Sequence, residues 1–219
     1  MKNLIIVGTG DYALVAYHFL KNEKSYRVIA FSEERNYIRF HKIEGLPNIP
    51  FEELEFKAHP EDTLLLIAIG PNKVNTVRER LYLNAKAKGY SFVKYISPEA
   101  SVWDAEAIGE NSFIFPKCVV EPFAKVGNNS VLWSGVVLAH HSEVKDHCFL
   151  APGVCISGRS VIGSNSFIGI NATIRDNVTV GEKCIVGGGA LIKKNIADGG
   201  VYSEPGTGRY KDDSFNTKV

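Results

Sequence analysis

The sequence predicts a small α/β domain with a Rossmann-like parallel sheet, followed by a parallel β-helix of hexapeptide repeats. Two observations predict this fold. Segments with strand and helix periodicity alternate over residues 1–96, and an aliphatic residue then recurs every six positions from residue 102 to 192. The change of period places the first domain at residues 1–96 and the second, with its C-terminal tail, at residues 97–219.

Strand and helix segments alternate in the first domain. The strands are expected at residues 3–7, 26–31, 63–69 and 91–96, and the helices at residues 11–22 and 72–88. Such alternation favours a parallel sheet flanked by helices.

The second domain repeats with a period of six. Sixteen successive positions, from Val102 to Ile192, are all Val, Ile or Leu. This period is typical of a triangular prism in which each hexad supplies one flat strand and one corner, and three hexads close a coil. The coils stack at the strand spacing of about 4.8 Å. We therefore expect a β-helix from about residue 99 to 196 whose aliphatic side chains point inward, among them Ile114, Leu132, Leu150 and Ile168.

Composition narrows the classes of partner. The formal net charge is +1, so no strongly charged surface for nucleic acid or anionic lipid is implied. No apolar run is long enough to span a membrane, and the first apolar run is too short for a signal peptide. We expect a cytoplasmic protein without a metal, whose cysteines are small buried apolar residues: Cys118, Cys148, Cys155 and Cys184.

Three histidines, His140, His141 and His147, cluster in the repeats. His140 is the second residue after an inward-pointing leucine, so it is expected to project outward near the end of a flat face rather than into the prism. One coil of eighteen residues later lies Gly158, whose backbone N–H would be open beside the imidazole. A base next to an oxyanion donor suits acyl transfer from a thioester. A plain surface histidine, and a glycine that only relieves a tight corner, remain alternatives.

A glycine-rich turn follows the first strand. The segment from Gly8 to Ala13 fits G-x-G-x-x-A, and Glu33 and Glu34 follow about twenty residues later, after the expected second strand. This pattern is a weak dinucleotide fingerprint, because too few strands precede the repeats for a complete NAD-binding fold. From the pattern itself, NAD binding and no ligand at all are both open at this turn.

Together these features resemble the hexapeptide-repeat sugar acyltransferases. The sequence is similar to the UDP-4-amino-sugar N-acetyltransferases of bacillosamine synthesis and to the sialic acid O-acetyltransferase-like family, over nearly the whole chain. The resemblance implies a left-handed β-helix, a homotrimer, and acetyl-CoA as co-substrate without a metal. It also implies a nucleotide-activated deoxyamino sugar, acetylated on its C4 amine, for lipopolysaccharide or other surface glycans.

The resemblance also implies roles for individual residues. His140 matches the general base, with His141 beside it, and the Gly158 amide matches the group that meets the thioester carbonyl. The coenzyme A groove is expected at Gly158, Gly169, Ile170, Asn171, Gly187 and Gly188. The nucleotide-sugar is expected at two loops of the first domain, through Gly8, Gly10, Asp11, Tyr12, Glu33, Gly70, Asn72 and Lys73.

The sequence departs from the bacillosamine-type pattern in three places. His141 stands where a glutamate follows the catalytic histidine, so His141, Glu143 or a residue of another subunit is left to orient His140. Phe149 replaces a histidine near the acceptor. The tail from residue 203 to 207 matches the family's ending only loosely.

Two other functions remain open from sequence. A sugar O-acetyltransferase would keep the chemistry and change the acceptor to a hydroxyl. A non-catalytic β-helix would act as a binding scaffold. A zinc enzyme of the same fold would need histidines that converge, whereas His147 is expected on a different part of the coil from His140.

Overall fold

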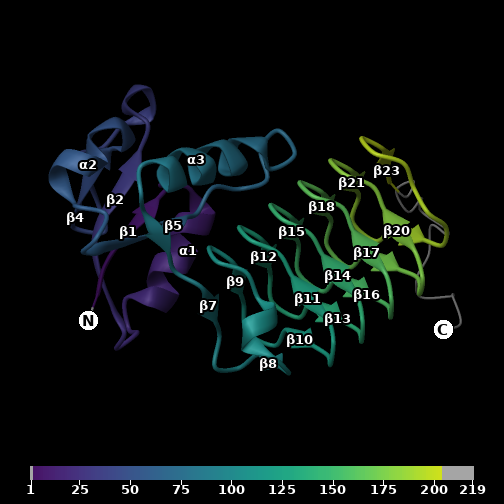
Figure 1. Cartoon of the computed structure of the whole chain (residues 1–219). Helices are drawn as coiled ribbons and strands as arrows, with labels where there is room; N and C mark the ends of the chain where they lie inside the picture. The colour runs from purple at the N-terminus through teal and green to yellow at the C-terminus, as the bar shows by residue number, and fades with distance from the viewer. Residues whose placement is uncertain (1, 204–219) are drawn as a thin grey trace, which may run out of the picture.

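A computed structural model describes residues 2–203 and has the two expected parts (Figure 1). An α/β domain lies at one end of the molecule, and the coils of a parallel β-helix stack away from it. The predicted fold class, an α/β domain followed by a left-handed β-helix, is confirmed.

The first domain is built on a six-stranded sheet with the strand order β3-β4-β2-β1-β5-β6. Its strands are β1 (Lys2–Val7), β2 (Tyr26–Glu33), β3 (Lys42–Ile43), β4 (Leu46–Pro50), β5 (Thr63–Ile67) and β6 (Ser91–Phe92). The helices are α1 (Asp11–Leu20), α2 (Leu54–Lys57) and α3 (Thr76–Ala87), with short 3-10 turns at Arg35–Tyr37 and Phe51–Glu53. A third 3-10 turn, at Ala105–Ala107, lies in the β-helix part. The central strand β1 is buried on both faces: Leu4 and Ile6 pack in one core cluster, and Ile5 and Val7 in the other.

Three details of the first domain differ from the sequence prediction. The antiparallel pair β3–β4 was not predicted, because β3 is only two residues long and β4 contains two prolines. The predicted strand at 91–96 is divided, since β6 pairs with β5 whereas β7 (Tyr95–Ile96) pairs with β9 of the β-helix. The second helix begins at Thr76 rather than residue 72, because residues 73–75 have positive φ angles.

The β-helix has three faces, each named here after one of its strands. The β12 face contains β7, β9 (Phe113–Ile114), β12 (Val131–Leu132), β15 (Phe149–Leu150), β18 (Phe167–Ile168), β21 (Ile185–Val186) and β23 (Val201–Tyr202). The β13 face contains β8 (Ser101–Val102), β10 (Val119–Val120), β13 (Val137–Leu138), β16 (Cys155–Ile156), β19 (Thr173–Ile174) and β22 (Leu191–Ile192). The β14 face contains β11 (Lys125–Val126), β14 (Glu143–Val144), β17 (Val161–Ile162) and β20 (Thr179–Val180).

The aliphatic repeat fills the interior of this prism. Ile114, Leu132, Leu150 and Ile168 all have 0% exposed surface, which confirms the inward direction predicted for them. Three of the four cysteines are also fully buried, at the narrowing of the corners, while Cys155 is half-buried. The prism therefore has a dry apolar core and carries its polar groups on the corners.

Every corner turns through one residue of left-handed backbone. Each sixth residue from Asn111 to Gly189 has a φ between +54° and +75°. Most of these residues are Asn or Gly, which tolerate this conformation, but two are histidines, His141 and His147. We name the corners by their place. The histidine corner (residues 139–142 and 157–160) joins the β13 and β14 faces. The docking corner (residues 127–130, 145–148 and 163–166) joins the β14 and β12 faces. The glycine corner (residues 169–172 and 187–190) joins the β12 and β13 faces.

The first domain packs against the β12 face through aromatic side chains. Tyr12 of α1 meets Phe113 and Phe149 edge-on, with ring centroids 6.1 Å and 6.2 Å away. Phe19 meets Phe115 at 5.5 Å. These contacts join the two parts into one continuous core cluster. Across residues 2–203, no helix combines the length and apolar character that crossing a membrane requires.

Candidate active site

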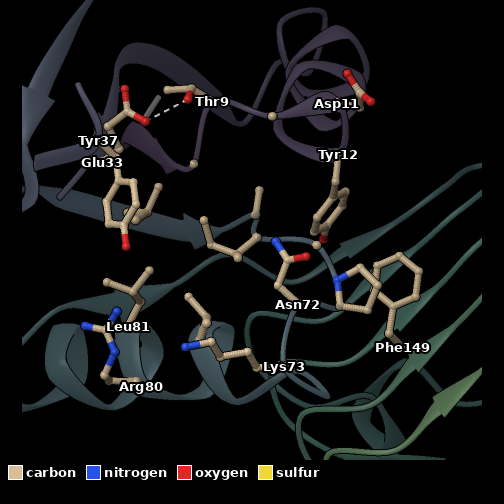
Figure 2. A pocket seen from close by; sticks show the side chains of 18 of the residues that line it. Thr9, Asp11, Tyr12, Glu33, Tyr37, Asn72, Lys73, Arg80, Leu81 and Phe149 are labelled. Carbon is tan, nitrogen blue, oxygen red and sulfur yellow. Dashed lines mark hydrogen bonds between the residues drawn. The ribbon is translucent and has the colours of Figure 1, made fainter. Parts of the chain in front are cut away.

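A cavity of about 860 Å³ lies between the first domain and the β12 face (Figure 2). All eight residues predicted to hold a nucleotide-sugar line it: Gly8, Gly10, Asp11, Tyr12, Glu33, Gly70, Asn72 and Lys73. They meet because β1 and β5 are adjacent parallel strands, so the loops that follow them leave the sheet at the same edge. The structure thus brings the two predicted loops together.

Gly8 shapes the turn between β1 and α1. Its φ is +125°, and a Cβ at this position would lie 2.5 Å from the Ala68 carbonyl oxygen, so no residue with a side chain fits. Gly10 follows as the N-cap of α1 and makes no side-chain cap. The first N–H groups of α1 are therefore available at the rim of the cavity, where a helix N-terminus favours an anion.

Acidic and basic side chains also line the cavity. Glu33 accepts a hydrogen bond from Thr9 Oγ1 at 2.9 Å (Figure 2). It accepts another from Asn48 Nδ2 at 2.7 Å, and together these bonds fix its carboxylate at the end of β2. Arg80 of α3 binds Glu34 through two bonds of 2.8 Å. This pairing lowers the pKa of the Glu34 carboxyl group, mainly through the Arg80 hydrogen bond. A fixed carboxylate at this position can accept hydrogen bonds from sugar hydroxyls.

The β-helix supplies an aromatic wall that the sequence did not predict as part of this site. Trp133 and Phe149 line the cavity from the β12 face, with Tyr12 beside them. In the sequence, only Phe149, which stands where the bacillosamine-type pattern has a histidine, pointed to an aromatic side chain near the acceptor. Burial raises the pKa of the Tyr12 hydroxyl, which has no hydrogen-bond partner within residues 2–203. The cavity therefore has one polar, loop-built side and one apolar side.

The histidine corner brings His140 and Gly158 into contact. A Cβ on Gly158 would lie 2.7 Å from His140 Cε1 and 2.9 Å from Nε2, so the imidazole ring covers the glycine. Within the described part of the chain, the Gly158 N–H has no hydrogen-bond acceptor. Its neighbour Arg159 instead donates its N–H to the His140 carbonyl at 3.1 Å. An exposed imidazole and a free N–H thus lie side by side on two stacked coils.

His141 is the side chain that meets the His140 ring. The Nδ1 atoms of the two histidines are 3.2 Å apart, and the His141 ring packs on Phe123 with centroids 4.7 Å apart. Glu121 accepts a bond of 2.7 Å from the backbone N–H of His140. Glu143, the other candidate for orienting His140, instead pairs with Lys145 at 2.7 Å. Within one chain, His141 is therefore the partner of the His140 ring.

The predicted coenzyme A residues meet at the glycine corner. Ile170 is 54% exposed, and Asn171 and Gly188 are also exposed beside it. A Cβ on Gly169 would lie 2.6 Å from Gly188 N, and a Cβ on Gly188 would lie 2.9 Å from Ile170 Cγ2. These glycines thus allow close stacking of the coils and leave a shallow, partly apolar surface. The tail motif continues beyond Ser203 and lies outside the described residues.

A single chain does not bring all these groups into one place. The cavity opens against the β12 face, while His140 and the coenzyme A residues lie on two different corners. Gly158 is the only predicted coenzyme A residue beside His140. His147 lies on the third corner, next to α3. Among residues 2–203, no group of three or more His, Cys, Asp or Glu side chains could hold a metal ion.

Family models match both halves of the chain. A PglD N-terminal domain matches residues 3–84, and the bacterial transferase hexapeptide repeat matches residues 107–140 and 159–194. The chain is therefore a hexapeptide-repeat acyltransferase, and it belongs to those that carry a PglD-type N-terminal domain. No curated protein sequence matches it.

Several solved structures share the fold along nearly their whole length. The acetyltransferase domain of PglB from Neisseria gonorrhoeae is 25% identical, with a TM-score of 0.83 over 93% of this chain and 97% of that one. A variant of perosamine N-acetyltransferase from Caulobacter crescentus, in complex with CoA and GDP-perosamine, is 23% identical, with a TM-score of 0.82 over 93% and 94%. WeeI from Acinetobacter baumannii is 22% identical, with a TM-score of 0.76 over 92% and 96%.

Proposed function

We propose that the protein transfers an acetyl group from acetyl-CoA to an amino group, the C4 amine, of a nucleotide-linked deoxyamino sugar used for surface glycans. The observation that carries this proposal is the histidine corner, where the exposed His140 imidazole lies against Gly158 and its free N–H. A base and an oxyanion donor held by stacked coils are what thioester aminolysis requires.

The corner can perform each step with these two groups. His140 Nε2 takes a proton from the amine as the nitrogen attacks the thioester carbonyl carbon. The Gly158 N–H donates to the oxyanion that forms. When the C–S bond breaks, the imidazolium returns the proton to the coenzyme A thiolate, leaving an amide and a free thiol. In this tautomer His140 Nδ1–H donates to His141 Nδ1, so His141 takes the place of the family's glutamate as an uncharged acceptor.

The 860 Å³ cavity is the proposed site of the nucleotide. The N-terminus of α1 and Lys73 can bind the phosphates, and the fixed Glu33 carboxylate can accept from the ribose hydroxyls. Two similar structures support these ligands. The Caulobacter enzyme was crystallised with CoA and GDP-perosamine. A second solved structure of the PglB domain, 26% identical to this chain, is a complex with acetyl coenzyme A.

The separation of the three groups supports a homotrimer. If neighbouring chains pack side by side, the histidine corner of one chain can face the cavity and glycine corner of the next. A second cavity of about 530 Å³ beside His141, bordered by the exposed rings of Trp103 and Phe123, offers apolar surface for such a neighbour. Light scattering should give a trimer at micromolar concentration. A clean monomer would contradict the shared site.

A thiol-release assay tests the reaction. Purified protein, acetyl-CoA and a panel of UDP-, GDP- and dTDP-linked 4-amino sugars should release free thiol with at least one acceptor, together with a product heavier by one acetyl group. Hydroxylamine then separates the two acceptor chemistries, because it cleaves an O-acetyl ester and leaves an amide intact. Cleavage would show a sugar O-acetyltransferase. Absence of thiol release with every acceptor would favour a binding scaffold.

A further inference from the structure

The loop between β5 and α3 lines the cavity and has an unusual backbone. Lys73, Val74 and Asn75 have φ angles of 50°, 51° and 62°, three consecutive left-handed residues without a glycine among them. This conformation is unfavourable for any side chain and most of all for a β-branched valine. Such a segment persists only when surrounding contacts hold it.

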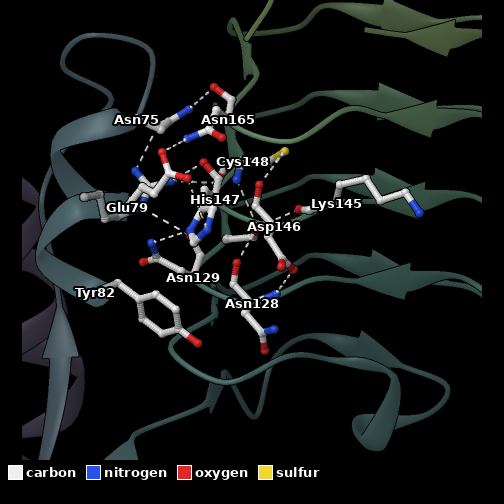
Figure 3. A network of polar contacts seen from close by, with 12 residues as sticks. Asn75, Glu79, Tyr82, Asn128, Asn129, Lys145, Asp146, His147, Cys148 and Asn165 are labelled. Atoms are coloured by element: carbon white, nitrogen blue, oxygen red, sulfur yellow. Dashed lines mark hydrogen bonds and ion pairs between the residues drawn. The ribbon is translucent and has the colours of Figure 1, made fainter. Parts of the chain in front are cut away.

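Asn75 makes those contacts with the β-helix. It is the N-cap of α3, where an asparagine side chain ordinarily accepts from the first N–H groups of the helix, yet it makes no such cap. Its Nδ2 instead donates to the carbonyl oxygens of Asn165 at 2.7 Å and Ser166 at 3.1 Å, on the docking corner (Figure 3). The side chain is fully buried.

Arg78, one helical turn later, bonds to the same corner. All five of its N–H groups have acceptors. Nε donates to the carbonyl of Asn129, and Nη2 donates to those of His147 and Cys148, at 2.8–3.2 Å. Nη1 donates to Asn75 Oδ1 at 2.9 Å and to the Ile69 carbonyl of the cavity loop at 3.3 Å. Arg78 has 0% exposed surface, and burial lowers its pKa to about 10. No carboxylate forms an ion pair with it within the described residues.

We propose that Asn75 and Arg78 are positioning residues, through which the docking corner holds residues 68–75 in the shape that receives the nucleotide. Neither side chain lines the cavity, whereas Ile69, Asn72 and Lys73 do. The bonds run from a rigid stack of coils to a strained loop, so the catalytic part of the chain sets the form of the binding loop. This inference rests on the proposed nucleotide site and adds what keeps that site in shape.

The test compares variants of Asn75 with a matched control. Asn75→Gly keeps the left-handed backbone and removes both bonds to the β-helix. Asn75→Asp keeps the size of the side chain and an acceptor for Arg78 but lacks the amide donors, and it serves if the glycine variant fails to fold. Tyr82→Phe removes a different tie between α3 and the β-helix, the 2.5 Å bond from Tyr82 to Glu110, and leaves the loop untouched.

Binding and exchange are measured separately. Titration calorimetry with UDP, GDP and dTDP as probes should show an affinity about tenfold weaker in both Asn75 variants, because only a fraction of the loops is then competent. Hydrogen exchange of the amides at 68–76 should accelerate in the same variants. Tyr82→Phe should change neither measurement, and coenzyme A affinity should stay the same in all three. Once an acceptor sugar is known, its KM should be higher in the Asn75 variants than in the wild type, and kcat should be unchanged.

Each outcome decides one question. Asn75 variants that bind the probes as tightly and exchange as slowly as the wild type would overturn the proposal. An equal effect of Tyr82→Phe would also overturn it, since any contact of α3 would then suffice. If the wild type binds none of the three nucleotides, the proposed nucleotide site is wrong, and the exchange measurement alone still shows whether Asn75 holds the loop.

Discussion

His141 and His147 occupy the same backbone position on two corners of one prism. Their φ angles are 58° and 63°, and each lies one residue before a buried small side chain. His141 is exposed, and its ring meets Phe123 and His140. His147 is 8% exposed, and its Nδ1 accepts a hydrogen bond of 2.8 Å from Asn129 Nδ2. Its Nε2 lies 3.8 Å from Glu79 Oε1.

What covers each corner accounts for the difference. Helix α3 lies over the docking corner, where His147 lies between Asn129 and Glu79 (Figure 3). Asn111 extends this polar chain, because its Nδ2 donates to Asn129 Oδ1 at 2.7 Å. No described residue of the first domain covers the histidine corner, and His140 is exposed there. Two histidines at equivalent backbone positions thus differ in burial because a helix from another part of the chain covers one of them.

The largest expected difference between substitutions at the two corners is in the turnover of acetyl transfer. His140→Ala is expected to lower kcat of acetyl transfer about a hundredfold or more, because general-base help is lost. Unfolding temperature should stay near that of the wild type, since the ring is exposed. Steady-state thiol release and thermal unfolding check both parts. A variant that keeps most of its activity would show that His140 is not the base.

A stability measurement sharpens the comparison at the buried histidine. His147→Gly should lower the free energy of unfolding by about 1–3 kcal/mol, because the buried Asn129 amide loses its partner. His147→Asn should lower it less, since asparagine suits a positive φ and extends the amide chain from Asn111 and Asn129. Urea denaturation measures both. Equal losses would mean that packing, rather than the hydrogen bond, dominates at this corner.

The same histidine predicts a pH dependence. Burial is the main cause that lowers the pKa of His147, and Arg78 lowers it further, whereas Glu79 and Asp146 oppose the shift. The unfolded chain, with a histidine pKa of about 6.5, therefore binds the proton first as the pH falls. The stabilisation that the neutral His147 contributes is fully present above about pH 6.5. It is lost progressively as the pH falls from there to the pKa of the folded protein. In His147→Asn, the decrease in the free energy of unfolding between pH 7.5 and 5.5 should be smaller than in the wild type by up to about 1 kcal/mol.

The sequence predicts some of this comparison and not the rest. The six-residue period was enough for the inward side chains and for an outward His140 over Gly158, because a regular coil carries position directly into space. The cavity loops were predicted from the glycine-rich turn and the resemblance to the sugar acyltransferases, and the structure brings them together because they follow adjacent parallel strands. The contact between the docking corner and Asn75 was not predicted, since Asn75 and Asn165 are 90 residues apart and nothing in the local sequence indicates that they meet. The aromatic wall of Trp133 was missed for the same reason.

The smallest expected effect concerns His141, and the matched substitution is again glycine. His141→Gly should change the free energy of unfolding by no more than about 0.5 kcal/mol, because relief of the left-handed strain offsets the lost contact with Phe123. Turnover should fall on the order of tenfold, less than in His140→Ala, because His140 is still present as the base. It loses only the His141 Nδ1 acceptor, which keeps the proton of the His140 ring on Nδ1. If turnover falls as far as in His140→Ala, the two rings act as one unit. If stability falls as far as in His147→Gly, something covers the histidine corner in solution as α3 covers the docking corner, and a neighbouring chain is the candidate.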